Sequence, residues 1–138
     1  MKPVSQVFQV KPIGYVRNGR GFSKVSILPE YGEGLDGVET FTHIILLCWM
    51  HMARRDVLKV RPRPRPDILC GVFATRSPSR PNPIGIYVVK LLKKEGLELY
   101  ISPIDAYDGT PVLDIKPYIA EIDSVPDAGL GLFNKQSG

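Results

Sequence analysis

The sequence predicts a mainly all-β fold, a small closed or partly closed β-barrel of six to seven short strands joined by irregular loops. Two observations predict it. The 138 residues include 13 Gly and 13 Pro, which interrupt long helices and favour short strands joined by turns. Several Val- and Ile-rich segments lie between these breakers, and closing such strands into a barrel removes their exposed edges.

The strands expected in the first half follow from the positions of β-branched and aromatic residues. Phe8–Arg17 and Lys24–Leu28 are two strands, joined by the short glycine-bearing connection Asn18–Ser23. Pro29–Gly37 is expected to be turns with one helical turn at most. Thr42–His51 is the most strand-like segment of the chain, and its near-continuous apolar character predicts burial on both faces.

The second half is expected to hold a short strand, a hairpin and a loop. Gly71–Thr75 is the short strand. Ile86–Lys94 and Leu97–Ser102 form the hairpin, because apolar and polar residues alternate along the second segment. Asp105–Pro117 is dense in Asp, Gly and Pro, which is typical of a loop.

Length and composition indicate one globular domain over residues 1–138, and the small, polar and glycine-rich residues 124–138 indicate a flexible tail. Hydrophobic residues make up 43% and charged residues 23%, which argues against disorder. The longest apolar run, Ile44–Met50, is too short for a membrane span, and the first residues show no secretory signal. The two cysteines suit free thiols of a reducing compartment, so the cytoplasm is the expected location.

The net charge of +4 is concentrated in one segment. From Arg54 to Arg80 there are eight basic and two acidic residues, whereas the rest of the chain has ten basic and twelve acidic ones. This asymmetry favours a site for an anion, with RNA, a phosphorylated metabolite and a carboxylate as candidates; a solvated basic loop is the alternative. Within the segment, the alternating Arg and Pro of Val60–Asp67 predict an extended, exposed linker with its guanidinium groups in water.

Two further patterns do not indicate sites. Gly32–Gly37 matches the glycine pattern of dinucleotide-binding loops, but Val38–Ile45 after it is expected to be a strand, so no helix is expected to hold a pyrophosphate. His43 and His51 would lie on one face of their strand and Cys48 on the other, so no metal site is expected.

Two loop segments carry the strongest candidate site residues. Arg76–Gly85 combines three prolines, which restrict the backbone, with two arginines and an Asn amide, and arginine pairs well with carboxylates and phosphates. Asp105–Tyr118 gathers carboxylates, a lysine and a tyrosine. The alternatives are a stiff surface loop for the first segment and an Asx-rich turn before an edge strand for the second.

These same residues resemble a known family. The sequence is similar to the TsaA-like family, the TrmO type of tRNA methyltransferases, over about Lys11–Asp123. The resemblance implies a single-domain β-barrel, usually a homodimer, that uses S-adenosylmethionine. The typical substrate is the N6 atom of threonylcarbamoyl-adenosine beside the tRNA anticodon. The matching motifs are Pro12–Gly14, Phe41–His51, Gly71–Ser77, Arg80–Gly85 and Asp108–Tyr118.

The resemblance also implies roles for single residues. Arg76 would hold the methionine moiety of the cofactor, and Ile86 would pack nearby. The other implied cofactor contacts are His51, Met52, Ser102, Pro103, Ile104 and Asp105. The basic segment and the proline-rich loop supply the expected substrate contacts, namely Arg61, Arg63, Arg65, Arg80 and Asn82. Candidates for removing the proton of the acceptor nitrogen are Asp108, Lys116 and Tyr118.

The sequence departs from the family pattern at one place. Typical members carry a Pro-Arg-Gln-bearing loop between the first two strands, whereas Asn18–Ser23 is short and lacks this triplet. Three functions therefore stay open: a tRNA methyltransferase, a methyltransferase of the same fold with a small-molecule acceptor, and a non-catalytic RNA- or cofactor-binding barrel.

Overall fold

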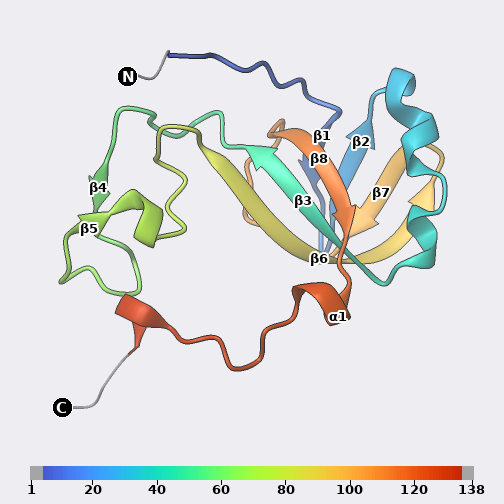
Figure 1. Cartoon of the computed structure of the whole chain (residues 1–138). Coiled ribbons are helices and arrows are strands. Elements are labelled where there is room, and N and C mark those ends of the chain that lie inside the picture. Colours follow the sequence, from blue (N-terminus) through green and yellow to red (C-terminus); the bar gives the residue numbers. More distant parts are fainter. Residues whose placement is uncertain (1–4, 135–138) are drawn as a thin grey trace.

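In the computed structural model, which describes residues 5–134, six antiparallel strands close into a barrel in the order β1-β2-β7-β6-β3-β8 (Figure 1). The predicted all-β fold class is confirmed. No helix within the described range is long and apolar enough to cross a membrane. The barrel strands are β1 (Gly14–Asn18), β2 (Ser23–Ile27), β3 (His43–Trp49), β6 (Ile84–Glu95), β7 (Glu98–Ile101) and β8 (Pro111–Pro117).

A smaller part of the chain, residues 50–83 between β3 and β6, lies to one side of the barrel and is called the β4–β5 lobe below (Figure 1). Its two-residue strands β4 (Lys59–Val60) and β5 (Cys70–Gly71) pair with each other. The remaining elements are short helical turns: η1 (Pro29–Leu35), η2 (Val38–Thr40), η3 (Val72–Ala74), α1 (Ala120–Asp123) and η4 (Gly131–Phe133).

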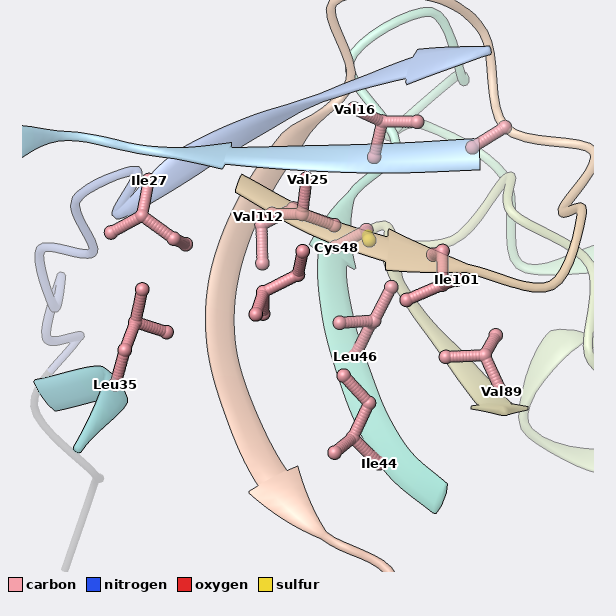
Figure 2. Close-up of a cluster of buried hydrophobic side chains, with 12 residues drawn as sticks. Val16, Val25, Ile27, Leu35, Ile44, Leu46, Cys48, Val89, Ile101 and Val112 are labelled. Atoms are coloured by element: carbon pink, nitrogen blue, oxygen red, sulfur yellow. The ribbon is translucent and has the colours of Figure 1, made fainter. Parts of the chain in front are cut away.

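The hydrophobic core fills the barrel (Figure 2). Alternation along β3 turns Ile44, Leu46 and Cys48 inward, where all three are fully buried. Burying such an aliphatic side chain contributes about 1.5–3 kcal/mol. The outward residues of β3 are only half-buried, so the prediction that this strand is buried on both faces is wrong. The barrel closes into one layer, which leaves its outer face without a covering sheet.

The first strand begins later than predicted. β1 starts at Gly14, and Phe8 within the expected strand is 82% exposed. Pro12 has no N–H with which to continue the ladder to β8. The β1–β2 connection is a tight turn closed by a hydrogen bond from the Gly19 N–H to the Phe22 carbonyl (2.9 Å), as its short sequence indicates.

The segment Asp105–Pro117 is the largest error of the strand prediction. Its second half, Pro111–Pro117, is β8, which pairs with both β1 and β3 and so closes the barrel. The prolines at the two ends of this strand are typical of loops, which is why the sequence predicts a loop here. Proline is nevertheless tolerated at a strand's first residue. The buried Val112 and Ile115, which packs against the core, are the apolar residues that hold β8 in place.

Two other expected strands are partly helical turns. Cys70–Gly71 is extended, but the rest of the predicted strand Gly71–Thr75 is the 3₁₀ turn η3. Likewise, the chain after Gly37 forms η2 before β3 begins at His43. The predicted hairpin of β6 and β7 is confirmed, with its turn at Glu95-Gly96, where Gly96 has a positive φ of 59°.

Candidate functional site

A broad groove of about 1510 Å³ receives residues from both parts of the molecule. The barrel contributes the start of β6 and the loop before β8, and the β4–β5 lobe contributes the chain around β4 and the proline-rich loop 75–82. Among the predicted site residues, the lining includes Arg61, Arg63, Arg76, Arg80, Asn82, Ile86 and Asp105. Residues 25 and more positions apart in the sequence therefore meet in one groove.

The loop 75–82 is shaped by its own polar groups. The buried Thr75 hydroxyl donates to the Val72 carbonyl (2.8 Å) and accepts from the Ser77 N–H (3.1 Å). The Arg80 guanidinium donates from Nη1 to the carbonyls of Thr75 (3.0 Å) and Ser77 (2.9 Å). Arg80 therefore closes the loop on itself, in addition to lining the groove.

Arg76 projects from this closed loop as an available cation. Its side chain is exposed, and within residues 5–134 it forms no ion pair. The rigid loop fixes where its guanidinium emerges, and a planar guanidinium can donate two parallel hydrogen bonds to a carboxylate. Arg76 is thus suited to hold an anionic group at this side of the groove.

On the barrel side, Tyr87 and Asp105 form a polar pair. The Tyr87 hydroxyl donates to Asp105 Oδ1 at 2.9 Å. Burial, together with this hydrogen bond and the nearby carboxylate charge, raises the pKa of Tyr87 well above its usual value. The phenol therefore stays protonated at neutral pH and keeps donating to the carboxylate.

The loop that carries Asp105 is held by the end of the β1–β2 hairpin. The buried Ser23 hydroxyl accepts from the Ile104 N–H (3.1 Å) and donates to Asn18 Oδ1 (2.7 Å). The Asn18 amide donates to the Ala106 carbonyl (2.8 Å). Asn18 and Ser23 are positioning residues that the sequence reasoning missed. Their partners lie more than 80 positions away, so no local pattern could have identified them.

Positive charge dominates the groove. Asp105 is the one carboxylate among its described lining residues, which include six basic side chains. Arg54 is the least free of these, because its guanidinium pairs with both oxygens of Asp56 at 2.9 and 3.0 Å. The basic lining residues are Arg54, Lys59, Arg61, Arg63, Arg76 and Arg80. The groove therefore favours an anionic ligand.

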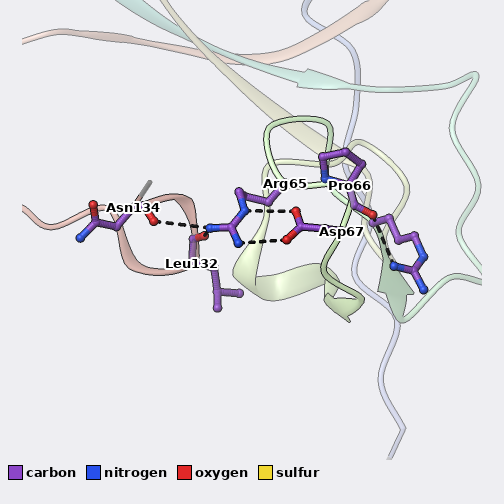
Figure 3. Close-up of polar contacts among 6 residues, drawn as sticks. Arg65, Pro66, Asp67, Leu132 and Asn134 are labelled. Atoms are coloured by element: carbon purple, nitrogen blue, oxygen red, sulfur yellow. Dashed lines mark hydrogen bonds and ion pairs between the residues drawn. The ribbon is translucent and has the colours of Figure 1, made fainter. Parts of the chain in front are cut away.

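Arg65 behaves differently from its neighbours. Its guanidinium pairs with both oxygens of Asp67 and donates to the carbonyls of Leu132 (3.2 Å) and Asn134 (3.4 Å) (Figure 3). The side chain is 28% exposed. The prediction of an extended linker with all guanidinium groups in water is wrong here, because the segment folds back and Arg65 binds backbone carbonyls of the C-terminal segment.

Several implied cofactor residues lie near the groove without lining it. His51 and Met52 follow Met50, which does line it. Ser102 exchanges hydrogen bonds with the Lys90 backbone: its hydroxyl accepts from the Lys90 N–H, and its N–H donates to the Lys90 carbonyl. Ile104 packs against the barrel core. Pro103 lies between them. Of this implied set, the structure brings Arg76, Ile86 and Asp105 together.

The three candidates for proton removal do not line the groove. Asp108 accepts a hydrogen bond from the Asn18 N–H (2.7 Å) at the end of β1. Lys116 pairs with Asp114 at 3.3 Å on β8, and the Tyr118 N–H donates to the His43 carbonyl. Each of the three is thus placed at the barrel strands, and a role for any of them stays a prediction.

Neither the histidines nor the cysteines form a site. Within residues 5–134 no group of three or more His, Cys, Asp and Glu side chains is placed to hold a metal ion. Cys48 lies inside the barrel, and burial raises the pKa of its thiol to about 11. The thiol is therefore uncharged at neutral pH and is a poor nucleophile.

The geometry is thus that of a small barrel whose arginine- and proline-rich loop borders a basic groove. The model of the tRNA-methyltransferase O N-terminal domain matches residues 11–124. The chain belongs to this family.

Curated relatives and solved structures agree with the family. An S-adenosyl-L-methionine-binding protein of Archaeoglobus fulgidus is 47% identical over 130 residues, covering 84% of this chain and 93% of the relative. A putative S-adenosylmethionine-dependent methyltransferase RcsF of Pseudomonas aeruginosa is 42% identical, covering 89% of this chain and 62% of the relative. The crystal structure of TrmO aligns with a TM-score of 0.76 at 38% identity.

The length of the relatives varies. The alignment to the TrmO crystal structure covers 94% of this chain but 63% of that chain. A second, probable S-adenosyl-L-methionine-binding protein of A. fulgidus is 45% identical, and 38% of its length is covered. This chain thus corresponds to nearly all of some relatives and to one part of others.

Proposed function

We propose that this protein is an S-adenosylmethionine-dependent methyltransferase that modifies N6 of a threonylcarbamoyl-adenosine next to the tRNA anticodon. The observation that carries the proposal is the groove, which Arg76, Ile86 and Asp105 line together with five further basic side chains. Membership of the tRNA-methyltransferase O family and the names of the relatives support the cofactor and the reaction.

The residues of the groove fit the chemistry of S-adenosylmethionine. The free guanidinium of Arg76 suits the methionine carboxylate, and the Asp105 carboxylate suits an ammonium or a ribose hydroxyl. Ile86 and Met50 offer apolar surface for an adenine or a thioether. Gly85 allows Met50 to pack closely against β6, because a Cβ there would lie 2.9 Å from Met50 Sδ.

Bound S-adenosylmethionine would supply a methyl group on its sulfonium: the acceptor N6 would bond to the methyl carbon as the S–CH3 bond breaks, S-adenosylhomocysteine would leave as the neutral thioether, and the N6 proton would pass to solvent or a nearby base. The work left to the protein is to position the acceptor in line and to exclude water. Arg76 and Asp105 would fix the two ends of the cofactor, while Arg61 and Arg63 would contact phosphates of the RNA. Tyr87, held protonated against Asp105, would keep that carboxylate oriented.

One observation favours a second candidate, a methyltransferase with a small-molecule acceptor. The β1–β2 connection is a tight turn, so it cannot form the wall that the longer loop of typical members provides. Without such a wall, less of a bulky modified nucleotide would be enclosed. A small acceptor would need less enclosure.

We further propose a cytoplasmic homodimer that uses the outer face of β3 and β6. In register, Ile45 faces Val88, Leu47 faces Ile86 and Trp49 faces Ile84, which makes an apolar ladder on the barrel's outside. Ile84, Ile86 and Val88 are 43%, 44% and 53% exposed. Ile84 and Ile86 also line the groove, so a second copy on this face would border the site and supply the missing wall.

Light scattering at assay concentration tests the dimer. Val88→Lys places a charge in the ladder and should give a monomer with reduced activity, whereas Lys90→Ala, on the same strand and also exposed, should leave the dimer intact. A monomeric wild type with full activity would contradict the dimer.

Methyl transfer from labelled S-adenosylmethionine tests the function. Three acceptors are compared: tRNA carrying threonylcarbamoyl-adenosine, the same tRNA without that modification, and the free modified nucleoside. Label in the modified tRNA alone, located at N6 after digestion to nucleosides, supports the proposal. Label in the nucleoside but not in tRNA supports the second candidate, and cofactor binding without transfer to any acceptor contradicts both.

A further inference from the structure

The C-terminal segment supplies an aromatic side chain to the basic side of the groove. After α1 the chain runs back past the barrel to the β4–β5 lobe, where η4 (Gly131–Phe133) lies (Figure 1). Phe133 is half-buried and lines the groove together with Arg61, Pro62 and Arg63. This residue lies outside the range matched by the family model, which ends at 124.

Arg65 holds this turn in place. Its Nη1 donates to the carbonyls on both sides of Phe133, those of Leu132 (3.2 Å) and Asn134 (3.4 Å) (Figure 3). Nε and Nη2 are bound by Asp67 at 3.1 and 3.0 Å, which fixes the plane of the guanidinium. The Arg65 guanidinium already donates to Asp67 and to two backbone carbonyls, so few of its N–H groups remain to bind a phosphate.

We propose that Phe133 is a stacking platform for an unpaired nucleobase of the RNA acceptor, and that Arg65 is the positioning residue that presents it. The inference rests on the proposed tRNA substrate. An aromatic ring beside unpaired arginines is the arrangement by which proteins bind single-stranded RNA, with rings stacking on bases and guanidinium groups meeting the phosphates. Phe133, Arg61 and Arg63 line the same groove and so offer both kinds of group to one ligand.

The assignment divides the basic segment into two roles. Within residues 5–134 Arg63 makes no ion pair, and Arg61 makes one hydrogen bond, to the Pro66 carbonyl (3.3 Å). These two are the phosphate contacts. Arg65 acts through the turn that it holds, so its loss should have the signature of a lost stacking contact and not that of a lost phosphate contact.

The experiment measures the affinity of the full chain for a tRNA anticodon stem-loop by fluorescence anisotropy at several salt concentrations. Phe133→Ala should weaken binding by about 5- to 100-fold and leave the slope of log affinity against log salt unchanged. Phe133→Trp should retain the affinity. Leu132→Ala, in the same turn and outside the groove lining, is the matched control and should bind as the wild type does.

Arg65→Gln should reproduce the loss of Phe133→Ala, again with an unchanged salt slope, and the double variant should be no weaker than either single variant. Arg63→Gln should instead reduce the salt slope by about one. Binding of S-adenosylmethionine, measured by calorimetry, should be the same in all of these variants and reports that they are folded.

Three results would overturn the assignment. Wild-type RNA affinity in Phe133→Ala would show that the ring stacks no base. A weaker cofactor affinity with unchanged RNA affinity would place the ring against the cofactor, and a reduced salt slope in Arg65→Gln would make Arg65 a phosphate contact. If the wild type binds the cofactor but no RNA, the proposed tRNA substrate itself fails, a result visible before any variant is compared.

Discussion

The two sides of the groove are built by different interactions. On the barrel side, β3 and β6 pair over seven residue pairs, and the inward side chains of β3 are fully buried. The β4–β5 lobe has a ladder of two residue pairs. Much of its remaining polar structure comes from arginines that donate to backbone carbonyls, as Arg55 does to Pro81 (2.9 Å) and Arg80 to Thr75 and Ser77.

This difference shows how to interpret a cluster of basic residues. The lobe has few buried apolar side chains, and hydrogen bonds from its arginines to backbone carbonyls hold its loops together. Arg65 and Arg80 are engaged in this way, whereas Arg63 and Arg76 form no ion pair within residues 5–134. A count of positive charges in the segment therefore overstates the number of groups available to a ligand. The following predictions test this division, from the largest expected effect to the smallest.

Shortening a fully buried core side chain should have the largest effect on the free energy of unfolding. Leu46→Ala removes a fully buried side chain and should lower the free energy of unfolding by about 2–5 kcal/mol. Leu92→Ala on β6, where the side chain is 48% exposed, is the control and should change it by less than about 0.5 kcal/mol. Urea denaturation measures both. Equal effects would mean that the interior of the barrel is not its stabilising core.

Removing the Arg76 guanidinium of the proline-rich loop should weaken cofactor binding. Arg76→Ala should cost about 2 kcal/mol of S-adenosylmethionine binding, because a charge-assisted pair with a carboxylate is lost. Titration calorimetry measures it, and Arg63→Ala, which removes the same charge near β4 and not in the proline-rich loop, should bind the cofactor normally. An unchanged affinity in folded Arg76→Ala would exclude Arg76 from the cofactor site.

Breaking the link between the β1–β2 hairpin and the loop that carries Asp105 should affect both the stability of the fold and cofactor binding. Ser23→Ala leaves the Ile104 N–H without its acceptor and should lower the free energy of unfolding by about 1–3 kcal/mol. Because the loop 102–108 carries Asp105, cofactor affinity should fall as well. Ser26→Ala, at a half-buried hydroxyl of the same strand, is the control for stability, and a variant with wild-type cofactor affinity would contradict the positioning role.

Much of the fold could be predicted from the sequence, and the reasons are local. The period-2 alternation of Leu97–Ser102 identifies β7, because burial acts on every second residue, and the β-branched and apolar run Thr42–His51 identifies β3 as a strand. β8 was missed because its prolines resemble loop residues. Its pairing with β1 and β3, about 70 to 100 positions away, is set by the closure of the barrel.

The groove was harder to predict than the fold. The sequence indicates Arg76 and Asp105 as polar candidates in two loop segments, the family resemblance adds Ile86 and the cofactor role of all three, and their position along one groove depends on where the chain passes in three dimensions. Phe133 was missed altogether, since an isolated aromatic in a Gly-rich segment gives no signal of the groove it lines. The expected flexible tail covers this segment, and its residues 135–138 lie outside the described range.

The smallest expected effect belongs to the polar pair on the barrel side. Tyr87→Phe removes the hydrogen bond to Asp105 and should lower the free energy of unfolding at pH 7 by about 0.5–1.5 kcal/mol. The pH dependence is the sharper test. The pKa of Tyr87 is raised in the folded state, so the phenol binds its proton more tightly there than in the unfolded chain.

Stability from Tyr87 is therefore fully present below the usual tyrosine pKa of about 10 and is lost as the pH rises beyond it. Cys48 acts in the same direction, because burial raises its pKa to about 11. Urea denaturation between about pH 8 and 11 should show a steep decline for the wild type and a shallower one for Tyr87→Phe, in which the contribution of Cys48 remains. Equal slopes in the two proteins would mean that Tyr87 titrates as it does in the unfolded chain.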